Sequence, residues 1–164
     1  QSFPNLVDLN LTENQVADLS PLTHVPQLKN LELSGNPITD FSPVSALTQL
    51  ERLDLSGQPI SDLSFLTPLH NLRSLNLDGM PVEDLSPLSS LTQLESLSLF
   101  MGQVSDVRPL ATLTHLRELL LSGNQITDAR PLSTLTQLEV LDLLGNPLRD
   151  RTCPVQPASV CLSE

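Results

Sequence analysis

Apolar residues recur along the chain in a pattern that repeats every 22 positions. Leucine stands at positions 6, 28, 50, 72, 94, 116 and 138, with no insertion or deletion between successive copies. From these leucines the sequence runs close to Leu-x-x-Leu-x-Leu-x-x-Asn-x-Ile, as from Leu28 to Ile38 and from Leu116 to Ile126. A fixed period of this length is typical of a solenoid, in which each repeat forms one coil that stacks on its neighbours.

Each repeat contains a short alternation that predicts a strand. In Leu31-Glu32-Leu33 apolar and polar residues alternate, which is the two-residue period of a strand with one buried face. Strands this short are stable only when they stack at about 4.7–4.9 Å in one parallel sheet. The turn Ser34-Gly35-Asn36-Pro37 and its counterparts then reverse the chain. We expect one interior column from the central leucines of the strands, which are Leu31, Leu53, Leu75, Leu97, Leu119 and Leu141.

The second half of each repeat reads Asp-x-Ser-Pro-Leu, as from Asp18 to Leu22 and from Asp84 to Leu88. The same column holds Asp40, Asp62, Asp106, Asp128 and Asp150. An aspartate there can accept from a backbone N–H two or three residues later, and proline is tolerated in an opening turn. These features predict a 3₁₀ or short helical turn on the outer face. A calcium ladder is the alternative, although it needs several oxygens converging on one point.

The sequence Asn-x-Ile-x-Asp-Leu-x-Pro-Leu after the strand resembles the 22-residue, SDS22-like and internalin-type subclass of leucine-rich repeats. This resemblance implies an α/β solenoid, a right-handed superhelix with a concave parallel sheet and 3₁₀ or short helical turns on the convex side. It also implies that a protein partner binds on the concave face. We expect a short lead-in over residues 1–5, seven repeats over residues 6–152 and a C-terminal cap over residues 153–164.

The two cysteines of the chain, Cys153 and Cys161, lie beyond the last repeat, in an ending that resembles the terminal segment of bacterial family members. An uncovered end of the leucine column would expose apolar area, so we expect a lid that a disulfide closes; two free buried thiols are the alternative. A bridge implies an oxidising, extracytoplasmic location, whereas free thiols imply the cytoplasm. Residues 1–5 offer no comparable lid, since Phe3 is their sole large apolar residue, and this suggests a trimmed piece of a longer protein.

The chain is acidic, with a formal net charge of -11 and a pI near 4.4. Residues 1–107 hold 13 acids and 3 bases, a net charge of -10, whereas residues 108–164 hold 6 acids and 5 bases, a net charge of -1. Binding of nucleic acid needs a basic surface, so this charge argues against nucleic acid and anionic membranes. No run of about 18 apolar residues predicts a span of the bilayer.

The three outward positions of each predicted strand are polar in the first four repeats and partly apolar from the fifth repeat onward. There Phe100, Leu120, Val140 and Leu144 stand on a face that should meet water. We predict a partner-binding patch of Phe100, Leu120, Leu144 and Val140 with Arg117, Glu118 and Asp142 at its rim. Alternatively, the C-terminal residues fold back over Val140 and Leu144 and leave only Phe100 and Leu120 exposed.

The asparagine column of the repeat is broken in the middle of the chain. It reads Asn14, Asn36, Gln58, Met80, Gly102, Asn124 and Asn146. Asparagine in this column normally satisfies backbone groups of neighbouring coils, so the coils near Met80 and Gly102 must satisfy them differently. The break indicates either local flexibility or simple drift of the sequence.

Residue types with catalytic potential do not come together in this repeat. His24, His70 and His115 fall in three different columns of three coils, and no nucleophile, base and acid share a register. The sequence therefore predicts a monomeric protein-binding module with no catalytic residues, metal or cofactor, whose partner it does not identify. The alternatives are a regulatory subunit of an intracellular enzyme and a structural spacer. A disulfide between Cys153 and Cys161 would favour an exported binding module, whereas two free thiols would favour the intracellular regulatory subunit.

Overall fold

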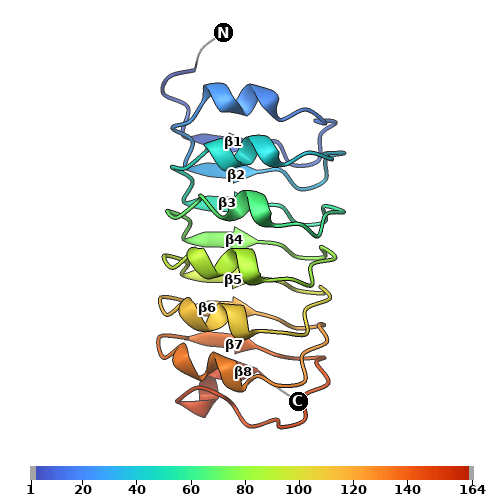
Figure 1. Ribbon diagram of the computed structural model, residues 1–164, viewed down its shortest axis with the longest axis vertical. Helices are drawn as coiled ribbons and strands as arrows, with labels where there is room; N and C mark the ends of the chain where they lie inside the picture. Colours follow the sequence, from blue (N-terminus) through green and yellow to red (C-terminus); the bar gives the residue numbers. More distant parts are fainter. Residues whose placement is uncertain (1–2, 163–164) are drawn as a thin grey trace.

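The computed structural model describes residues 3–162, which form a single stack of coils (Figure 1). Their strands are β1 (Asp8–Asn10), β2 (Asn30–Glu32), β3 (Arg52–Asp54), β4 (Ser74–Asn76), β5 (Ser96–Ser98), β6 (Glu118–Leu120), β7 (Val140–Asp142) and β8 (Cys161–Leu162). The 3₁₀ segments are η1 (Ser20–His24), η2 (Ser42–Ala46), η3 (Ser64–Leu66), η4 (Ser86–Ser90), η5 (Arg108–Thr112), η6 (Arg130–Thr134) and η7 (Ala158–Val160). The strands follow one another along the long axis, and the helical turns form a second column in front of them.

One parallel sheet in the order β1 to β8 holds the stack together. Its register is 22 residues from β1 to β7, so that Leu31 pairs with Leu53 and Leu53 pairs with Leu75. The central leucines of β2 to β7 are buried within one continuous core that extends from Leu19 to Val160. The predicted interior column is therefore confirmed, and the leucine-rich-repeat fold with it.

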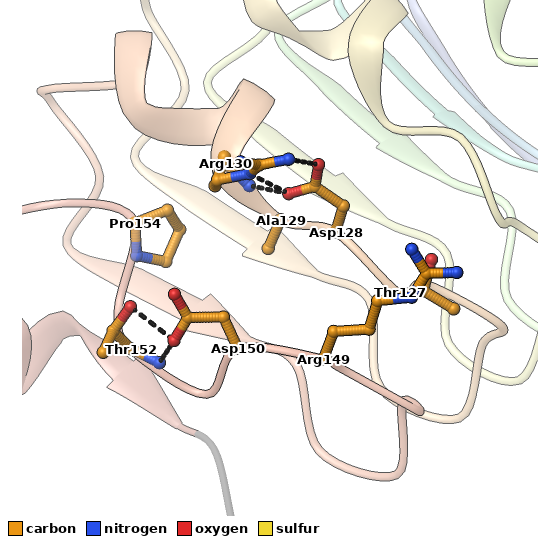
Figure 2. A pocket seen from close by; sticks show the side chains of 8 residues that line it. All are labelled: Thr127, Asp128, Ala129, Arg130, Arg149, Asp150, Thr152 and Pro154. Atoms are coloured by element: carbon orange, nitrogen blue, oxygen red, sulfur yellow. Dashed lines mark hydrogen bonds and ion pairs between the residues drawn. The ribbon is translucent and has the colours of Figure 1, made fainter.

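The aspartate of each repeat binds the backbone two residues later, which is where η1 to η6 begin in the first six repeats. In the seventh repeat the predicted turn does not follow Asp150, because the next 3₁₀ segment, η7, begins only at Ala158. In every coil the Oδ1 atom accepts from the backbone N–H two residues later at 2.8–3.0 Å, for example from Ser20 to Asp18 and from Thr152 to Asp150 (Figure 2). Hydrogen bonds from the side chain and the backbone of the residue two positions later lower the pKa of each aspartate below its ordinary value. Each carboxylate therefore accepts a backbone hydrogen bond within its own coil, as the sequence predicts.

Asparagine side chains join neighbouring coils where the column is intact. Asn124 Nδ2 donates to the carbonyl oxygens of Leu99 at 2.7 Å and Leu121 at 2.8 Å, and its Oδ1 accepts from the Val104 N–H at 3.0 Å. Asn36 and Asn146 make equivalent sets of bonds. One side chain therefore satisfies three backbone groups that the repeat would otherwise leave buried and unpaired.

The middle of this column satisfies its backbone only in part. Gln58 donates to the Leu33 carbonyl at 3.0 Å, but its buried Oε1 has no hydrogen-bond partner within residues 3–162. Next to Met80 the backbone compensates by itself, since the Val82 N–H donates to the Met80 carbonyl at 2.8 Å. Gly102 is closely packed, because a Cβ atom there would lie 2.8 Å from Asn124 Oδ1.

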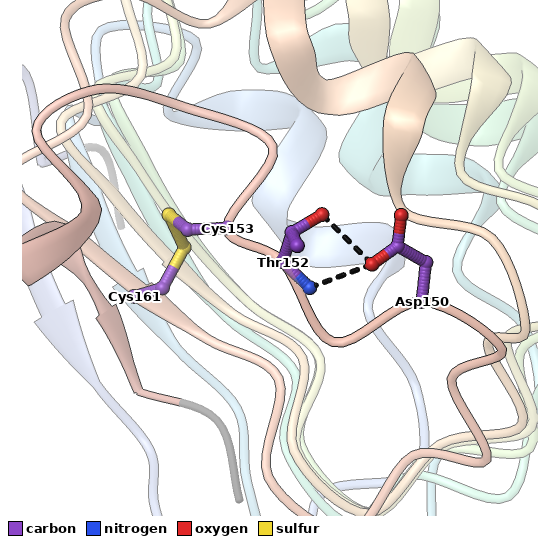
Figure 3. The surroundings of a disulfide bond; sticks show 4 residues. All are labelled: Asp150, Thr152, Cys153 and Cys161. Atoms are coloured by element: carbon purple, nitrogen blue, oxygen red, sulfur yellow. Dashed lines mark hydrogen bonds between the residues drawn. A yellow bond between two sulfur atoms is a disulfide. The ribbon is translucent and has the colours of Figure 1, made fainter.

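The C-terminal cap continues the sheet as well as covering its end. Cys153 and Cys161 form a disulfide, as predicted, with their Cα atoms 5.8 Å apart (Figure 3). Val155 and Val160 are buried against the last coil. Strand β8 pairs with β7, which places Cys161 beside Leu141 at the end of the interior column. This eighth strand was not predicted from the period, because residues 153–162 do not carry the repeat motif.

The N-terminal end of the described residues is less covered. Phe3 and Val7 are exposed, and Leu6 and Leu9 are only half-buried. Phe3, Leu6 and Leu9, together with η1, border an apolar hollow of about 840 Å³. Residues 3–162 contain no helix that is long and apolar enough to cross a membrane.

Candidate functional site

The outward face of the sheet carries three rows of side chains, and we call this surface the sheet face. The register places the first two rows along the solenoid, one residue per coil. Backbone hydrogen bonds from Gly57, Gly79 and Gly123 to Asp78, Phe100 and Leu144 of the next coils continue the same order in the third row. The middle row, for example, passes from Asp54 through Asn76 and Ser98 to Leu120. Residues that are 22 positions apart in the sequence therefore lie on adjacent strands, as the repeat predicts.

The predicted patch residues stand on the sheet face at β5 to β7. Phe100 is 44% exposed and Leu144 is 36% exposed, whereas Leu120 and Val140 are half-buried. The alternative in which the cap covers Val140 and Leu144 is wrong for Leu144, because β8 lies beside β7 as the next strand of the sheet. Apolar surface is thus open to solvent where the sequence predicts it.

Two further apolar side chains extend this surface, and sequence reasoning missed both. Met101 is 64% exposed and Leu162 is 49% exposed. Leu162 pairs with Asp142 in β7 and so stands in the middle row, which could not be foreseen without β8. Met101 has φ = 54° and occupies the repeat position at which Gly79 and Gly123 also have positive φ. A methionine at a position that other repeats fill with glycine was therefore the feature of the sequence that could have identified it. We define the apolar patch as Phe100, Met101, Leu120, Val140, Leu144 and Leu162.

Carboxylates of the sheet face fix the backbone under the patch. Asp78 Oδ1 accepts from the Phe100 N–H at 2.8 Å and from Ser98 Oγ at 2.5 Å. Asp142 Oδ1 accepts from the Leu144 N–H at 3.0 Å. The backbone segments that carry Phe100 and Leu144 are therefore held in place before any partner arrives.

The predicted rim residues Arg117 and Glu118 are partly engaged. Arg117 Nη1 lies 2.6 Å from Glu139 Oε1, and Glu118 Oε2 accepts from Ser96 Oγ at 2.8 Å. The Arg117 pair belongs to a ladder of alternating charge beside the strands, in which Lys29 pairs with Glu51 at 2.7 Å and Arg73 with Glu95 at 2.5 Å. Exposed pairs of this kind contribute little stability, so they stay available for exchange with a partner.

The polar half of the sheet face is hollowed over β1 to β4. A depression of about 470 Å³ is bordered by side chains of these four strands, among them Asp8, Asn30, Glu32, Arg52 and Asp54. Hydrogen bonds link adjacent coils here, from Arg52 Nη1 to Asn30 Oδ1 at 3.1 Å and, in shorter contacts, from Asn30 to Asp8 and from Asn10 to Glu32. Polar groups therefore dominate the sheet face at this end.

Another hollow, of about 270 Å³, lies on the side of the last helical turns, near Asp128 and Asp150 (Figure 2). Arg130 donates two bonds to Asp128, at 2.9 Å and 2.6 Å, which lower the pKa of Asp128 to about 2. Asp150 accepts from Thr152, and the two carboxylates face different partners. Within residues 3–162 no group of three or more His, Cys, Asp or Glu is arranged to hold a metal ion. These carboxylates serve the turns of their own coils.

Comparisons with known proteins agree with this geometry. A family model for leucine-rich repeats in two copies matches residues 26–68 and 114–152. The crystal structure of an internalin C2 from Listeria monocytogenes is 37% identical, with a TM-score of 0.91, and the match covers 98% of this chain and 71% of that one. An internalin, inlF, from the same organism is 32% identical, with a TM-score of 0.84, over 88% of this chain and 43% of that one. No curated protein sequence matches the chain. The chain therefore belongs to the leucine-rich-repeat proteins of the internalin type.

Proposed function

We propose that the chain is a protein-interaction module that binds its partner on the sheet face and has no catalytic role. The observation that carries this proposal is the apolar patch, which interrupts a sheet face that is otherwise polar. Exposed apolar clusters with a charged border mark interaction surfaces, and solenoids use their extended sheets for binding. Arg117, Glu118 and Asp142 provide that border.

The composition of the patch suits an anchor for a partner. Phe100 presents an aromatic ring at low entropic cost, because its backbone is already fixed by Asp78. Met101 adds a flexible side chain that can adapt to the partner surface. Leu144 and Leu162 extend the apolar area toward the C-terminal end. Burial of these side chains would supply the main affinity, and the polar border would set the orientation.

We further propose that the module acts outside the cytoplasm of a bacterium. The disulfide between Cys153 and Cys161 supports this location, because such bonds persist in oxidising compartments. The organism of both internalin structures supports the bacterial origin. The bridge disfavours the intracellular regulatory subunit. A purely structural spacer would leave the exposed Phe100 ring without a role.

The test is a pull-down from the native source with the double variant Phe100→Ser/Leu120→Ser. Both side chains point away from the core, so the circular dichroism spectrum and the melting temperature should stay close to those of the parent. We expect captured proteins to lose at least tenfold in affinity, as for hot-spot residues. The matched control is Val7→Ser, which removes an exposed apolar side chain ahead of β1. Unchanged affinity of the double variant would refute the proposal.

A further inference from the structure

The carboxylates of the sheet face lack the cationic partners that carboxylates beside the sheet possess. The sheet face carries one basic residue, Arg52, and six acidic residues, Asp8, Glu32, Asp54, Asp78, Glu118 and Asp142. Within residues 3–162 none of these six carboxylates lies within 4.0 Å of a basic nitrogen. By contrast, Glu51, Glu95 and Glu139 at the edge of the sheet are each paired. The sheet face therefore carries an excess of negative charge where a partner would dock.

We propose that the partner is a basic polypeptide segment that lies along the solenoid, with lysine or arginine side chains over β2 to β4 and an apolar side chain on the apolar patch. This inference rests on the proposed function and names the chemistry of its partner. Charge complementarity is the reason, because a face with unpaired carboxylates repels acidic partners and steers basic ones. The depression over β1 to β4 gives the basic side chains room beside Glu32 and Asp54.

The register fixes the spacing that such a segment needs. Glu32, Asp54, Leu120 and Leu162 stand in the same middle row, on β2, β3, β6 and β8. Adjacent strands lie about 4.8 Å apart, so Asp54 and Leu120 are separated by roughly 14 Å. An extended chain advances about 3.3–3.6 Å per residue, so roughly four residues span that distance. The fitting segment carries basic residues followed, about four positions away, by an aromatic or branched aliphatic residue.

A small cation fits this arrangement less well than a polypeptide does. The carboxylates are distributed along the rows, and each row position is one strand spacing from the next. Several of them already accept hydrogen bonds, as Asp54 does from the Ser56 N–H at 2.8 Å and Asp78 does from Phe100. A partner with several separated positive charges complements the surface better than one converging site would.

The test uses a random library of 12-residue peptides displayed on phage and selected against the whole chain. We expect the enriched peptides to combine Lys or Arg with an apolar residue at about the spacing above. The variant Glu32→Gln/Asp54→Asn/Asp78→Asn removes three charges, and the two asparagines can still accept the backbone bonds. It should slow association of these peptides about tenfold at low ionic strength and flatten the salt dependence of that rate.

The matched control is Asp40→Asn/Asp62→Asn/Asp84→Asn, which removes the same charge from the helical side of the solenoid. It should leave the association rate nearly unchanged, and an equal loss in both variants would overturn the inference. The enriched peptides could instead lack basic residues, bind Phe100→Ser more weakly and bind both charge variants as they bind the parent. That result would overturn the inference and leave the proposed function intact. Peptides whose affinity is also unchanged by Phe100→Ser would refute both.

Discussion

Substitution of Asn124 by alanine should cost far more stability than the same substitution of Gln58, although both residues occupy one column of the repeat. Asn124 satisfies two backbone carbonyls and the Val104 N–H in a buried setting. At about 1 kcal/mol for each of the three bonds, plus about 1–3 kcal/mol for a buried donor left unpaired, Asn124→Ala should lose about 4–6 kcal/mol. Gln58 makes one such bond, at 3.0 Å to the Leu33 carbonyl, so Gln58→Ala should lose about 1 kcal/mol from hydrogen bonding.

The two variants should be compared by urea denaturation followed by far-UV circular dichroism, because the chain has no Trp or Tyr. The midpoint of unfolding should fall for both, with an unchanged slope and a larger shift for Asn124→Ala. Gln58→Asn is a second check, since the shorter amide can reach both carbonyls and the facing N–H, as Asn36 does. Equal losses from both alanine variants would refute the assignment of stability to the asparagine bonds.

Three other predictions concern the C-terminal half of the molecule. Gly102→Ala should destabilise the chain by about 1 kcal/mol or more, because the added Cβ would overlap Asn124 Oδ1. The loss should be smaller in a chain that also carries Asn124→Ala, and a double-mutant cycle that shows no coupling between the two sites would contradict this explanation. Hydrogen bonds lower the pKa of Asp128 from its ordinary value of 3.8 to about 2 in the folded chain, so its stabilisation is complete above pH 3.8 and is lost as the pH falls through about 2. Thermal melts between pH 5 and pH 2 should therefore show a shallower decline for Asp128→Asn. Reduction of the disulfide between Cys153 and Cys161 opens a small loop and should lower the stability by about 2–3 kcal/mol. Dithiothreitol should therefore lower the melting temperature, and Cys153→Ser should lower it by a similar amount.

The sequence predicted the coils well because one physical requirement acts on all of them. Leucines at matching positions must stack, and this requirement fixes the strands, the interior column and the outward rows together. The bonds of the repeat aspartates followed from local chemistry, whereas the bridge between Cys153 and Cys161 followed from the need to close the end of the stack. Strand β8 did not, because its pairing with β7 depends on the path of a cap that lacks the repeat. Leu162 was missed for the same reason.

The candidate site was harder to predict, since outward positions are not constrained by stacking. Register identified Phe100 and Leu144 as exposed, but it could not show that neighbours half-bury Leu120. Nor could it show that Asp78 and Asp142 fix the backbone of the patch. Such bonds depend on side-chain conformations that the period leaves free. The sequence therefore predicts where the sheet face lies better than it predicts how that face is organised.

The fifth coil combines the departures from the repeat in one turn, where Phe100-Met101-Gly102 stands in place of Ser-Gly-Asn. Met101 has φ = 54° without being glycine, a conformation that costs about 1–2 kcal/mol for other residues. Phe100 and Met101 also expose apolar area that this fold could have kept polar. Gly102 is closely packed against Asn124, so the break in the column is an ordered feature of the coil. Burial of Phe100 and Met101 by a partner would remove the cost of this exposed apolar area, whereas the backbone of Met101 would keep its conformation, so the proposed function would give the irregular fifth coil a role in binding.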